Sequence, residues 1–284
     1  MNYLLLVSLG IIWGSSYLFI KVAVAEVPAL TLVAGRLVLA AVVLWIILRS
    51  LGRPTPRGRR LWEAYAVMGI LSGALPYALI SWGEQYIDSG LAALLQATMP
   101  IFTVILAMFL ANDDRLTGTA VFGVVLGFVG VAVLMLPDLR QGLHADILGQ
   151  LAIVAASVSY AAAAVFARNR LRGQPPLTST MGQMTMGAIF ALPLSLFVDR
   201  PFGISPSLPA MASWLALTIL GTVIAYVIYY ALIERTSATF VSTVTYVIPI
   251  VGIILGALVL NEPVTLNLVI SAALIIVGVL LVRA

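Results

Sequence analysis

The chain contains no cysteine, and its 284 residues include a single lysine and a single histidine. Without cysteine, disulfide bonds, thiol catalysis and cysteine–metal sites are excluded, and the redox compartment leaves no signature in the sequence. The lysine, Lys21, follows Ile20 instead of a glycine, so a phosphate-binding loop of the G-x-x-x-x-G-K-[ST] type is absent. The chain therefore does not drive a reaction by hydrolysing ATP through such a loop.

The single histidine, His144, lies in a connection between apolar stretches, where we expect a solvated side chain instead of a metal ligand or a base. Catalysis within a membrane would need a nucleophile beside a base. The apolar stretches offer hydroxyls and aromatic rings, but no histidine or carboxylate near their middle. The sequence thus predicts that the protein is not an enzyme and holds neither a metal ion nor another cofactor.

Charged residues are also scarce, since they make up 9% of the chain while hydrophobic residues make up 62%. Ordinary soluble domains carry about 25% charged residues. The apolar residues form blocks of roughly twenty, the length that a helix needs to cross a bilayer, and lipid forces such a segment to be helical. The sequence predicts an all-α integral membrane protein with ten transmembrane helices. They are expected at about 2–23, 30–50, 61–83, 90–111, 119–136, 147–167, 178–198, 210–233, 240–260 and 266–283.

The few charges are distributed unevenly among the connections. Arginines crowd the links at 49–60 and 168–172, whereas the alternate links carry mostly acids. This positive-inside pattern predicts a multi-pass protein of the plasma membrane, the inner membrane of a bacterium, with both termini in the cytoplasm. No aromatic stacking platform accompanies the basic links, so no nucleic-acid partner is expected. The expected partners are the lipid bilayer and a small-molecule substrate.

Two stretches of the sequence repeat one pattern. The stretches that begin at Pro100 and Pro249 each run through an apolar segment to an asparagine followed by an acid, and an offset of 149 residues superposes them. The repeat divides the chain into two predicted five-helix halves, 1–136 and 147–283. Because five is odd, the second half should enter the membrane from the opposite side, which makes the two halves inverted repeats.

The chain resembles the drug/metabolite transporter superfamily in its ten-helix EamA form. The resemblance covers nearly the whole chain and is carried by WGSSYLFIK, AGRLVLA, the Pro100 and Pro249 helices, and the final NEPVTLNLVISAALIIVGVLLV. It implies a carrier without a prosthetic group, usually an exporter of amino acids or other small metabolites. The YddG-like aromatic amino-acid exporters are one closer match, although likeness of fold does not fix a substrate.

Several polar residues are expected to lie at depth. Arg36 stands inside the second span, where a buried arginine either marks function or holds its helix to a neighbour. In this part of the repeat the offset is 147 residues, which places Arg36 on Gln183 and Lys21 on Arg168 in the second half. Lys21, near the end of the first span, is expected to snorkel to the interface, or else to meet a substrate carboxylate or Glu84.

Aromatic and hydroxyl residues recur on single helix faces, as Thr222, Tyr226 and Tyr229 do. They predict a pocket with aromatic walls and a few polar groups, the usual composition of a small-molecule site. Helix packing is the alternative for each residue taken alone. The expected substrate-binding residues are Trp13, Ser16, Tyr77, Gln96, Ser157, Tyr160, Gln183, Tyr226, Tyr229 and Tyr246. The expected gating or charge residues are Lys21, Arg36, Glu84, Pro100 and Pro249.

Three local patterns concern helix geometry. Pro100 and Pro249 lack a backbone donor and should bend their helices, either as hinges or as fixed kinks. The motifs ANDD and LNEP are expected to begin helices with the asparagine as cap. The G-x-x-x-G pairs at 123–127 and 252–256 predict close helix contacts. Whether those contacts lie within one chain or between the copies of a homodimer stays open.

The leading hypothesis is a secondary transporter that exports small metabolites by alternating access, with aromatic or other apolar amino acids first. An alternative is multidrug or cation–proton antiport, as in the small multidrug resistance proteins, which use an intramembrane carboxylate. The first span has none between Asn2 and Lys21. A non-transporting membrane scaffold is a third hypothesis, and the lack of a soluble output domain argues against it. Because no carboxylate lies near the middle of a span, we expect facilitated transport.

Overall fold

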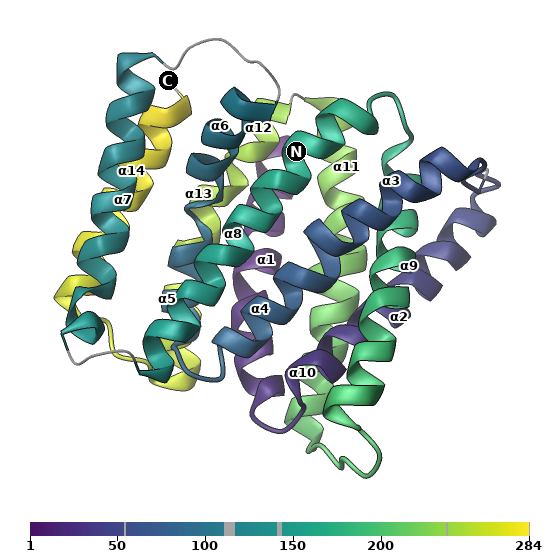
Figure 1. Cartoon of the computed structure of the whole chain (residues 1–284), viewed down its shortest axis with the longest axis horizontal. Helices are drawn as coiled ribbons and strands as arrows, with labels where there is room; N and C mark the ends of the chain where they lie inside the picture. The colour runs from purple at the N-terminus through teal and green to yellow at the C-terminus, as the bar shows by residue number, and fades with distance from the viewer. Residues whose placement is uncertain (54, 111–116, 141–143, 237, 284) are drawn as a thin grey trace.

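The apolar blocks fold as a bundle of helices in the computed structural model of the chain (Figure 1), which describes residues 1–284 apart from 54, 111–116, 141–143, 237 and 284. The described residues contain no strand. The first-half elements are α1 (Asn2–Val24), α2 (Ala29–Ser50), α3 (Arg59–Gly69), the π-helix η1 (Ile70–Ala74), α4 (Leu75–Gly83), α5 (Ser89–Gln96), α6 (Met99–Leu110) and α7 (Gly118–Leu139). The second-half elements are α8 (Ala145–Arg170), α9 (Pro176–Leu194), the π-helix η2 (Ser195–Asp199), α10 (Leu208–Thr218), the π-helix η3 (Ile219–Ile224), α11 (Ala225–Arg235), α12 (Ala238–Ser242), α13 (Val244–Leu260) and α14 (Leu266–Arg283).

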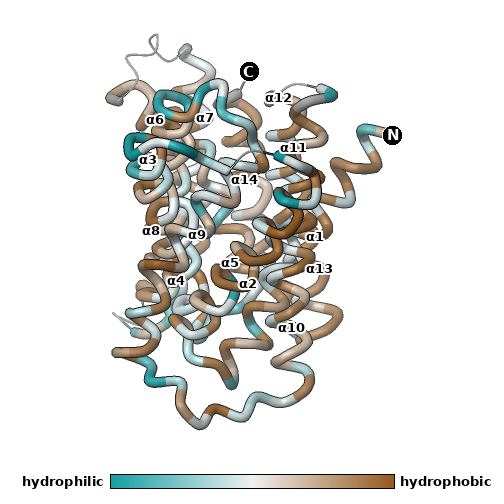
Figure 2. The backbone as a smooth tube through the Cα atoms, turned by 90° about the vertical axis from the view of Figure 1, so that its right-hand side faces the viewer, coloured by the Kyte–Doolittle hydropathy of each residue, from teal (hydrophilic) through white to brown (hydrophobic). Residues whose placement is uncertain are grey.

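Nine stretches of the described residues are long and apolar enough to cross a membrane, and a shorter apolar helix follows at Leu266–Val282. The described residues of each expected range are therefore mainly helical, while ten membrane crossings stay a prediction. Hydrophobic residues dominate along the helices, and hydrophilic residues gather mainly near the two ends of the bundle (Figure 2). Both chain ends lie at the same end of the bundle (Figure 1).

Two π-helical segments interrupt the third and eighth spans at matching places. The element η1 lies between α3 and α4, and η3 lies between α10 and α11. The offset of 149 residues carries the first residue of η1, Ile70, onto the first residue of η3, Ile219. A π-turn widens the helix locally and re-aims the side chains that follow, and such segments are frequent at functional sites.

The helix that contains Pro100 is interrupted, but not at the proline. The helix α5 ends at Gln96, the turn at Ala97 and Thr98 follows, and Pro100 occupies the first turn of α6. A proline is tolerated there because that turn has no intrahelical partner for its backbone N–H. Pro249 instead lies inside α13, so the two prolines do not have equal effects on their helices.

The expected helix start at LNEP is wrong. Asn261 adopts the left-handed conformation with φ of 57° and ends α13, because asparagine tolerates this conformation better than most residues. The next helix, α14, begins at Leu266, and the Thr265 hydroxyl accepts a hydrogen bond from the backbone N–H of Leu268 at 3.1 Å. The matching Asn112 lies outside the described residues.

The glycine pairs pack within the chain. A Cβ on Gly123 would lie 2.6 Å from the carbonyl oxygen of Gly278, which places the backbones of α7 and α14 in direct contact. Figure 1 shows these two helices side by side at one edge of the bundle. A Cβ on Gly252 would lie 2.5 Å from Cβ of Ala93, so α13 approaches α5 equally closely. Both pairs therefore contact helices of the same chain, and a homodimer stays a prediction.

Candidate functional site

A cavity of about 680 Å³ lies between helices of both halves. Lining residues come from α1, α2, α3, η1, α4, α5 and α6 in the first half, and from α8, α9, η3, α11, α12 and α13 in the second. Arg36 and Pro100 also line the cavity. Eight of the ten expected substrate-binding residues line it, namely Trp13, Ser16, Tyr77, Gln96, Tyr160, Gln183, Tyr226 and Tyr229.

Three aromatic side chains form a continuous wall of this cavity. The ring of Trp13 on α1 lies 5.6 Å from the ring of Tyr229 and 6.1 Å from that of Tyr226, measured between centroids. Tyr226 and Tyr229 on α11 lie 6.3 Å apart in an edge-to-face arrangement. Such edge-to-face pairs hold rings at fixed angles, so the wall offers an ordered apolar surface to a ligand.

Arg36 is held in the cavity by groups from both halves. Its Nε donates a hydrogen bond of 2.9 Å to Oγ1 of Thr222, and its Cζ lies 3.9 Å from the centroid of the Tyr77 ring. The Thr222 hydroxyl donates in turn to the carbonyl of Leu217, five residues earlier, at 3.3 Å. This carbonyl lies just before η3, so the π-helical segment helps to position the group that orients Arg36.

Gln183 is held in a corresponding way in the other half. Its Oε1 accepts a hydrogen bond of 3.1 Å from the Ser72 hydroxyl, and Ser72 belongs to η1. A polar residue of α2 therefore contacts η3, and the matching polar residue of α9 contacts η1. The charged Arg36 and the neutral Gln183 make the two sides of the cavity chemically different.

Two expected site residues do not line the cavity. Ser157 is fully buried, and its hydroxyl points at the carbonyl of Leu95 at 3.4 Å, so this face of α8 packs against α5. Tyr246 packs against the main hydrophobic cluster of the bundle. Both assignments followed helical spacing, which relates residues on one helix but does not fix how the helix is rotated toward its neighbours.

The expected gating residues Lys21 and Glu84 meet through the backbone. Nζ of Lys21 donates to the carbonyl oxygens of Glu84 and Ile87 at 2.7 and 2.8 Å. The lysine therefore binds backbone carbonyls at the end of α4, and its snorkelling to the interface stays a prediction. The Glu84 carboxylate is fully buried, and neither oxygen has a hydrogen-bond partner among the described residues. Neither residue lines the cavity, and Pro249 does not line it either.

The sequence missed several polar residues of the cavity, among them Tyr17, Ser72 and Arg168. Tyr17 directly follows Ser16, and adjacent residues lie on different faces of a helix. Selecting residues by spacings of three and four therefore excluded Tyr17. Arg168 was assigned to a basic link, yet it belongs to α8 and lines the cavity. Its match with Lys21 under the repeat was the available signal, because it placed a second cation at the end of an equivalent helix.

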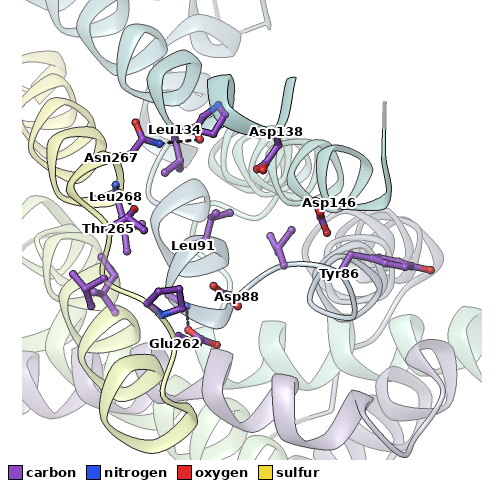
Figure 3. A pocket seen from close by; sticks show the side chains of 16 residues that line it. Tyr86, Asp88, Leu91, Leu134, Asp138, Asp146, Glu262, Thr265, Asn267 and Leu268 are labelled. Atoms are coloured by element: carbon purple, nitrogen blue, oxygen red, sulfur yellow. Dashed lines mark hydrogen bonds between the residues drawn. The ribbon is translucent and has the colours of Figure 1, made fainter. Parts of the chain in front are cut away.

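A smaller hollow of about 430 Å³ lies between the start of α5, the end of α7 and the link from α13 to α14 (Figure 3). In this view Asp88 and Glu262 lie close together, and Asp138 and Asp146 face them from other helices. Burial raises the pKa of the Asp88 carboxyl, the Glu262 carboxylate raises it further, and the Lys21 ammonium lowers it. Among the described residues, no group of three or more His, Cys, Asp or Glu side chains is placed to hold a metal ion.

Glu262 joins the two halves beside this hollow. Its carboxylate accepts hydrogen bonds from the backbone N–H of Ser89 at 2.8 Å, from the Ser89 hydroxyl at 3.0 Å and from the backbone N–H of Gly90 at 3.0 Å. These groups form the first turn of α5, where a negative charge is stabilised by the helix dipole. Glu262 therefore caps a helix of the other half instead of its own.

The architecture and the sequence agree with one protein family. The family model described as the EamA-like transporter family matches residues 1–136 and 147–284. The chain belongs to this family.

Relatives of this EamA-like chain are similar over most of their length. The chain is 24% identical to the uncharacterised transporter YoaV of Bacillus subtilis over 274 residues, which is 96% of this chain and 94% of the relative. It is 29% identical to an uncharacterised transporter of Archaeoglobus fulgidus, over 95% of this chain and 94% of the relative. It is 27% identical to the uncharacterised inner membrane transporter YedA of Escherichia coli, over 88% of this chain and 80% of the relative.

A solved structure shares the fold. A chain described as a crystal structure of protein matches with a TM-score of 0.70 at 18% identity, over 99% of this chain and 96% of that chain. At this identity the match concerns the fold alone. The family membership and the apolar helices together show that this EamA-like protein is a multi-pass membrane transporter.

Proposed function

We propose that this transporter exports small apolar metabolites by alternating access, with aromatic and other apolar amino acids as the first substrates to test. The observation that carries the proposal is the cavity of about 680 Å³ between the two halves. Its volume lies within the range of about 300–1,000 Å³ that is usual for small-molecule sites. Its aromatic wall and few polar groups suit a flat apolar body.

The arrangement of contacts around the cavity supports alternating access. The lining reaches Ala107, Arg168 and Ser242 toward the end of the bundle that carries the termini. At the opposite end, Glu262 binds the first turn of α5 and so holds the two halves together. With the termini in the cytoplasm of a bacterial cell, as the basic links favour, this arrangement corresponds to an inward-facing carrier.

Counterflow in proteoliposomes tests the proposal. Vesicles that contain the purified protein are loaded with an unlabelled amino acid and diluted into a trace of the labelled one. We expect transient accumulation of labelled phenylalanine, tyrosine or leucine above that in protein-free vesicles. No accumulation of any apolar amino acid would refute the proposed substrate class, and it is the result that a non-transporting scaffold would give.

Facilitated transport remains part of the proposal. Among the described residues that line the cavity there is no aspartate or glutamate, and Glu84 lies outside the lining. A proton-coupled carrier needs a group whose ionisation changes between conformations. We expect an imposed pH gradient to drive no net substrate accumulation in proteoliposomes. Accumulation that disappears in Glu84→Gln would instead show proton coupling through that buried carboxylate.

A further inference from the structure

We infer that Arg36 binds the carboxylate of the substrate and that the cavity selects apolar monocarboxylates, whether or not they carry an amino group. The inference rests on the proposed function, since it specifies what the same cavity selects. It reaches beyond amino acids, because it extends the substrate class to organic acids that lack the amine.

The donors of Arg36 are only partly used. A guanidinium carries five N–H donors in a planar fork. Nε donates to Thr222, the Tyr77 ring covers one face, and Arg36 makes no other hydrogen bond with the described residues. The two terminal nitrogens are therefore left for a ligand. Because Arg36 lines the cavity, a carboxylate there can accept two parallel hydrogen bonds from them, the geometry that arginine favours.

Arg36 also forms no ion pair among the described residues. Its side chain is only 6% exposed, and the buried Glu84 carboxyl interacts with it electrostatically without pairing with it. A buried charge without a partner is costly, especially within a membrane. An anionic ligand in the cavity would neutralise this charge, whereas a cationic ligand would add a second positive charge beside it.

An ammonium group would find no such counter-ion. The described lining residues include two arginines, Arg36 and Arg168, and no acid. The Gln96 amide oxygen is buried and has no hydrogen-bond partner among the described residues, so it can accept an N–H from a ligand without supplying a charge. The cavity therefore tolerates an amino group but does not require one. A 2-oxo acid or an arylpropionate should suit it as well as an amino acid does.

The rest of the ligand is expected to lie against the aromatic wall. Tyr77 both carries the guanidinium on its ring and lines the cavity, so it connects the anion-binding group to the apolar surface. Trp13, Tyr226 and Tyr229 extend that surface. A carboxylate at Arg36 thus places a flat apolar side chain near these rings.

The test compares ligands that share one phenyl group. Binding of phenylalanine, phenylpyruvate, 3-phenylpropionate, 3-phenylpropanamide and phenethylamine to the purified protein in nanodiscs is measured by calorimetry, and carriage is measured in proteoliposomes. We expect the three acids to bind. The neutral amide and the amine should bind at least about tenfold more weakly, because charge-assisted hydrogen bonds to arginine are among the stronger ones.

A matched pair of variants assigns the effect to Arg36. In Arg36→Gln, the affinity for 3-phenylpropionate should fall to that for its amide. In the control Arg49→Gln, the affinity for 3-phenylpropionate should not change. Arg49 is exposed and does not line the cavity, and its Cζ lies 4.8 Å from the centroid of the Trp45 ring. If Arg36→Gln does not fold, the comparison of acids, amide and amine on the wild-type protein still tests whether the cavity selects a carboxylate.

The outcomes separate the two proposals. If the amide or the amine binds as tightly as the acids, the carboxylate inference is overturned and the proposed transport function stands. If the acids bind selectively but no ligand is carried, the inference is supported and the proposed substrate class of the carrier is refuted. If no compound binds and none is carried, both are overturned.

Discussion

At the scale of single residues, Tyr77 and Tyr226 occupy equivalent positions of the repeat but have different contacts. The Tyr77 ring carries the guanidinium of Arg36, whereas the Tyr226 ring packs against Trp13 and Tyr229. Both rings line the cavity. If the cavity binds substrate, the first ring should affect recognition of the anion and the second should affect only the apolar body.

Removing either ring is therefore expected to weaken binding of aromatic substrates. An aromatic contact contributes about 0.5–1.5 kcal/mol beyond its buried area, so Tyr226→Ala should reduce affinity by up to about tenfold. Smaller aliphatic substrates should lose less. The Tyr77→Ala variant should weaken all carboxylate ligands, because it also removes the ring that holds Arg36.

Counterflow of phenylalanine and of leucine measures this difference. Tyr3→Ala is the matched control, since Tyr3 forms a similar ring pair with Phe240 at 5.2 Å but does not line the cavity. Equal loss for both substrates in Tyr226→Ala, together with a lower melting temperature in detergent, would assign this tyrosine to helix packing instead.

Glu26 provides a residue whose contribution to stability should depend on pH. Its carboxylate accepts hydrogen bonds from the hydroxyl and the backbone N–H of Ser207, both at 2.6 Å, at the start of α10. The hydroxyl contact, followed by the backbone contact, lowers the pKa of Glu26 below its ordinary value of 4.5. Since the folded pKa is the lower one, the stabilisation is present above the unfolded pKa and is lost as pH falls through the folded pKa.

The Glu26→Gln variant should consequently melt at a lower temperature than the wild type at neutral pH. The difference should close as the pH falls below about 4.5, where the wild-type carboxyl also becomes protonated. Melting curves in detergent across this range measure the effect. Glu63→Gln is the control, because its exposed pair with Arg59 is expected to contribute little. A difference in melting temperature between wild type and Glu26→Gln that stays constant with pH would contradict the role assigned to the Glu26 charge.

At the scale of elements, the contact between α7 and α14 depends on glycine. A Cβ on Gly123 would lie 2.6 Å from the Gly278 carbonyl oxygen and 2.7 Å from the backbone nitrogen of Val282. A larger side chain must push the two helices apart, and overpacking of this kind costs about 1–3 kcal/mol. We expect Gly123→Leu to lower the melting temperature clearly. Gly118→Leu should not, because nothing lies within 4 Å of a Cβ at that position of α7.

Gel filtration of the same variants separates packing within the chain from packing between copies. If the Gly123 face instead joins two copies, Gly123→Leu would dissociate a dimer without a comparable loss of thermal stability. That result would contradict the contact described here.

The elements also show where reasoning from the sequence reaches its limit. Apolar runs of about twenty residues predicted where the helices lie, because a segment in lipid must satisfy its backbone hydrogen bonds internally. The π-helical segments η1 and η3 and the turn at Ala97 and Thr98 were not predicted. Such interruptions depend on contacts with neighbouring helices, which compensate for the lost backbone hydrogen bonds. The periodicity of residues along one helix does not predict these contacts.

For the candidate site, the sequence predicted many of the residues but not how their helices are rotated. Side chains such as Trp13 and Tyr226 stood out because polar or aromatic groups are rare within apolar spans. The rotation of each helix was not encoded in its own spacing, and so Ser157 faces α5 and Tyr17 faces the cavity. The role of Glu262 was also missed, because its partner Ser89 lies in the other half of the chain.

At the scale of the whole molecule, the orientation of the protein in the membrane decides to which side the cavity opens. The structure places both termini at one end of the bundle, and the lining of the cavity reaches toward that end. If the positive-inside pattern holds, this end is cytoplasmic and the transporter is open to substrate from inside the cell. If the orientation is the reverse, the same structure would be an outward-facing carrier.

Single cysteines decide between these two orientations, and the chain has no cysteine of its own to give a background. Arg57→Cys lies in the basic link between α2 and α3, and Arg140→Cys lies at the end of α7 and is exposed. A membrane-impermeant maleimide added to intact cells should label position 140, and it should label position 57 only after the membrane is opened. Labelling of position 57 alone in intact cells would reverse the orientation and the assigned conformation. Labelling of both positions from one side would contradict the inverted repeat, since an odd number of crossings separates them.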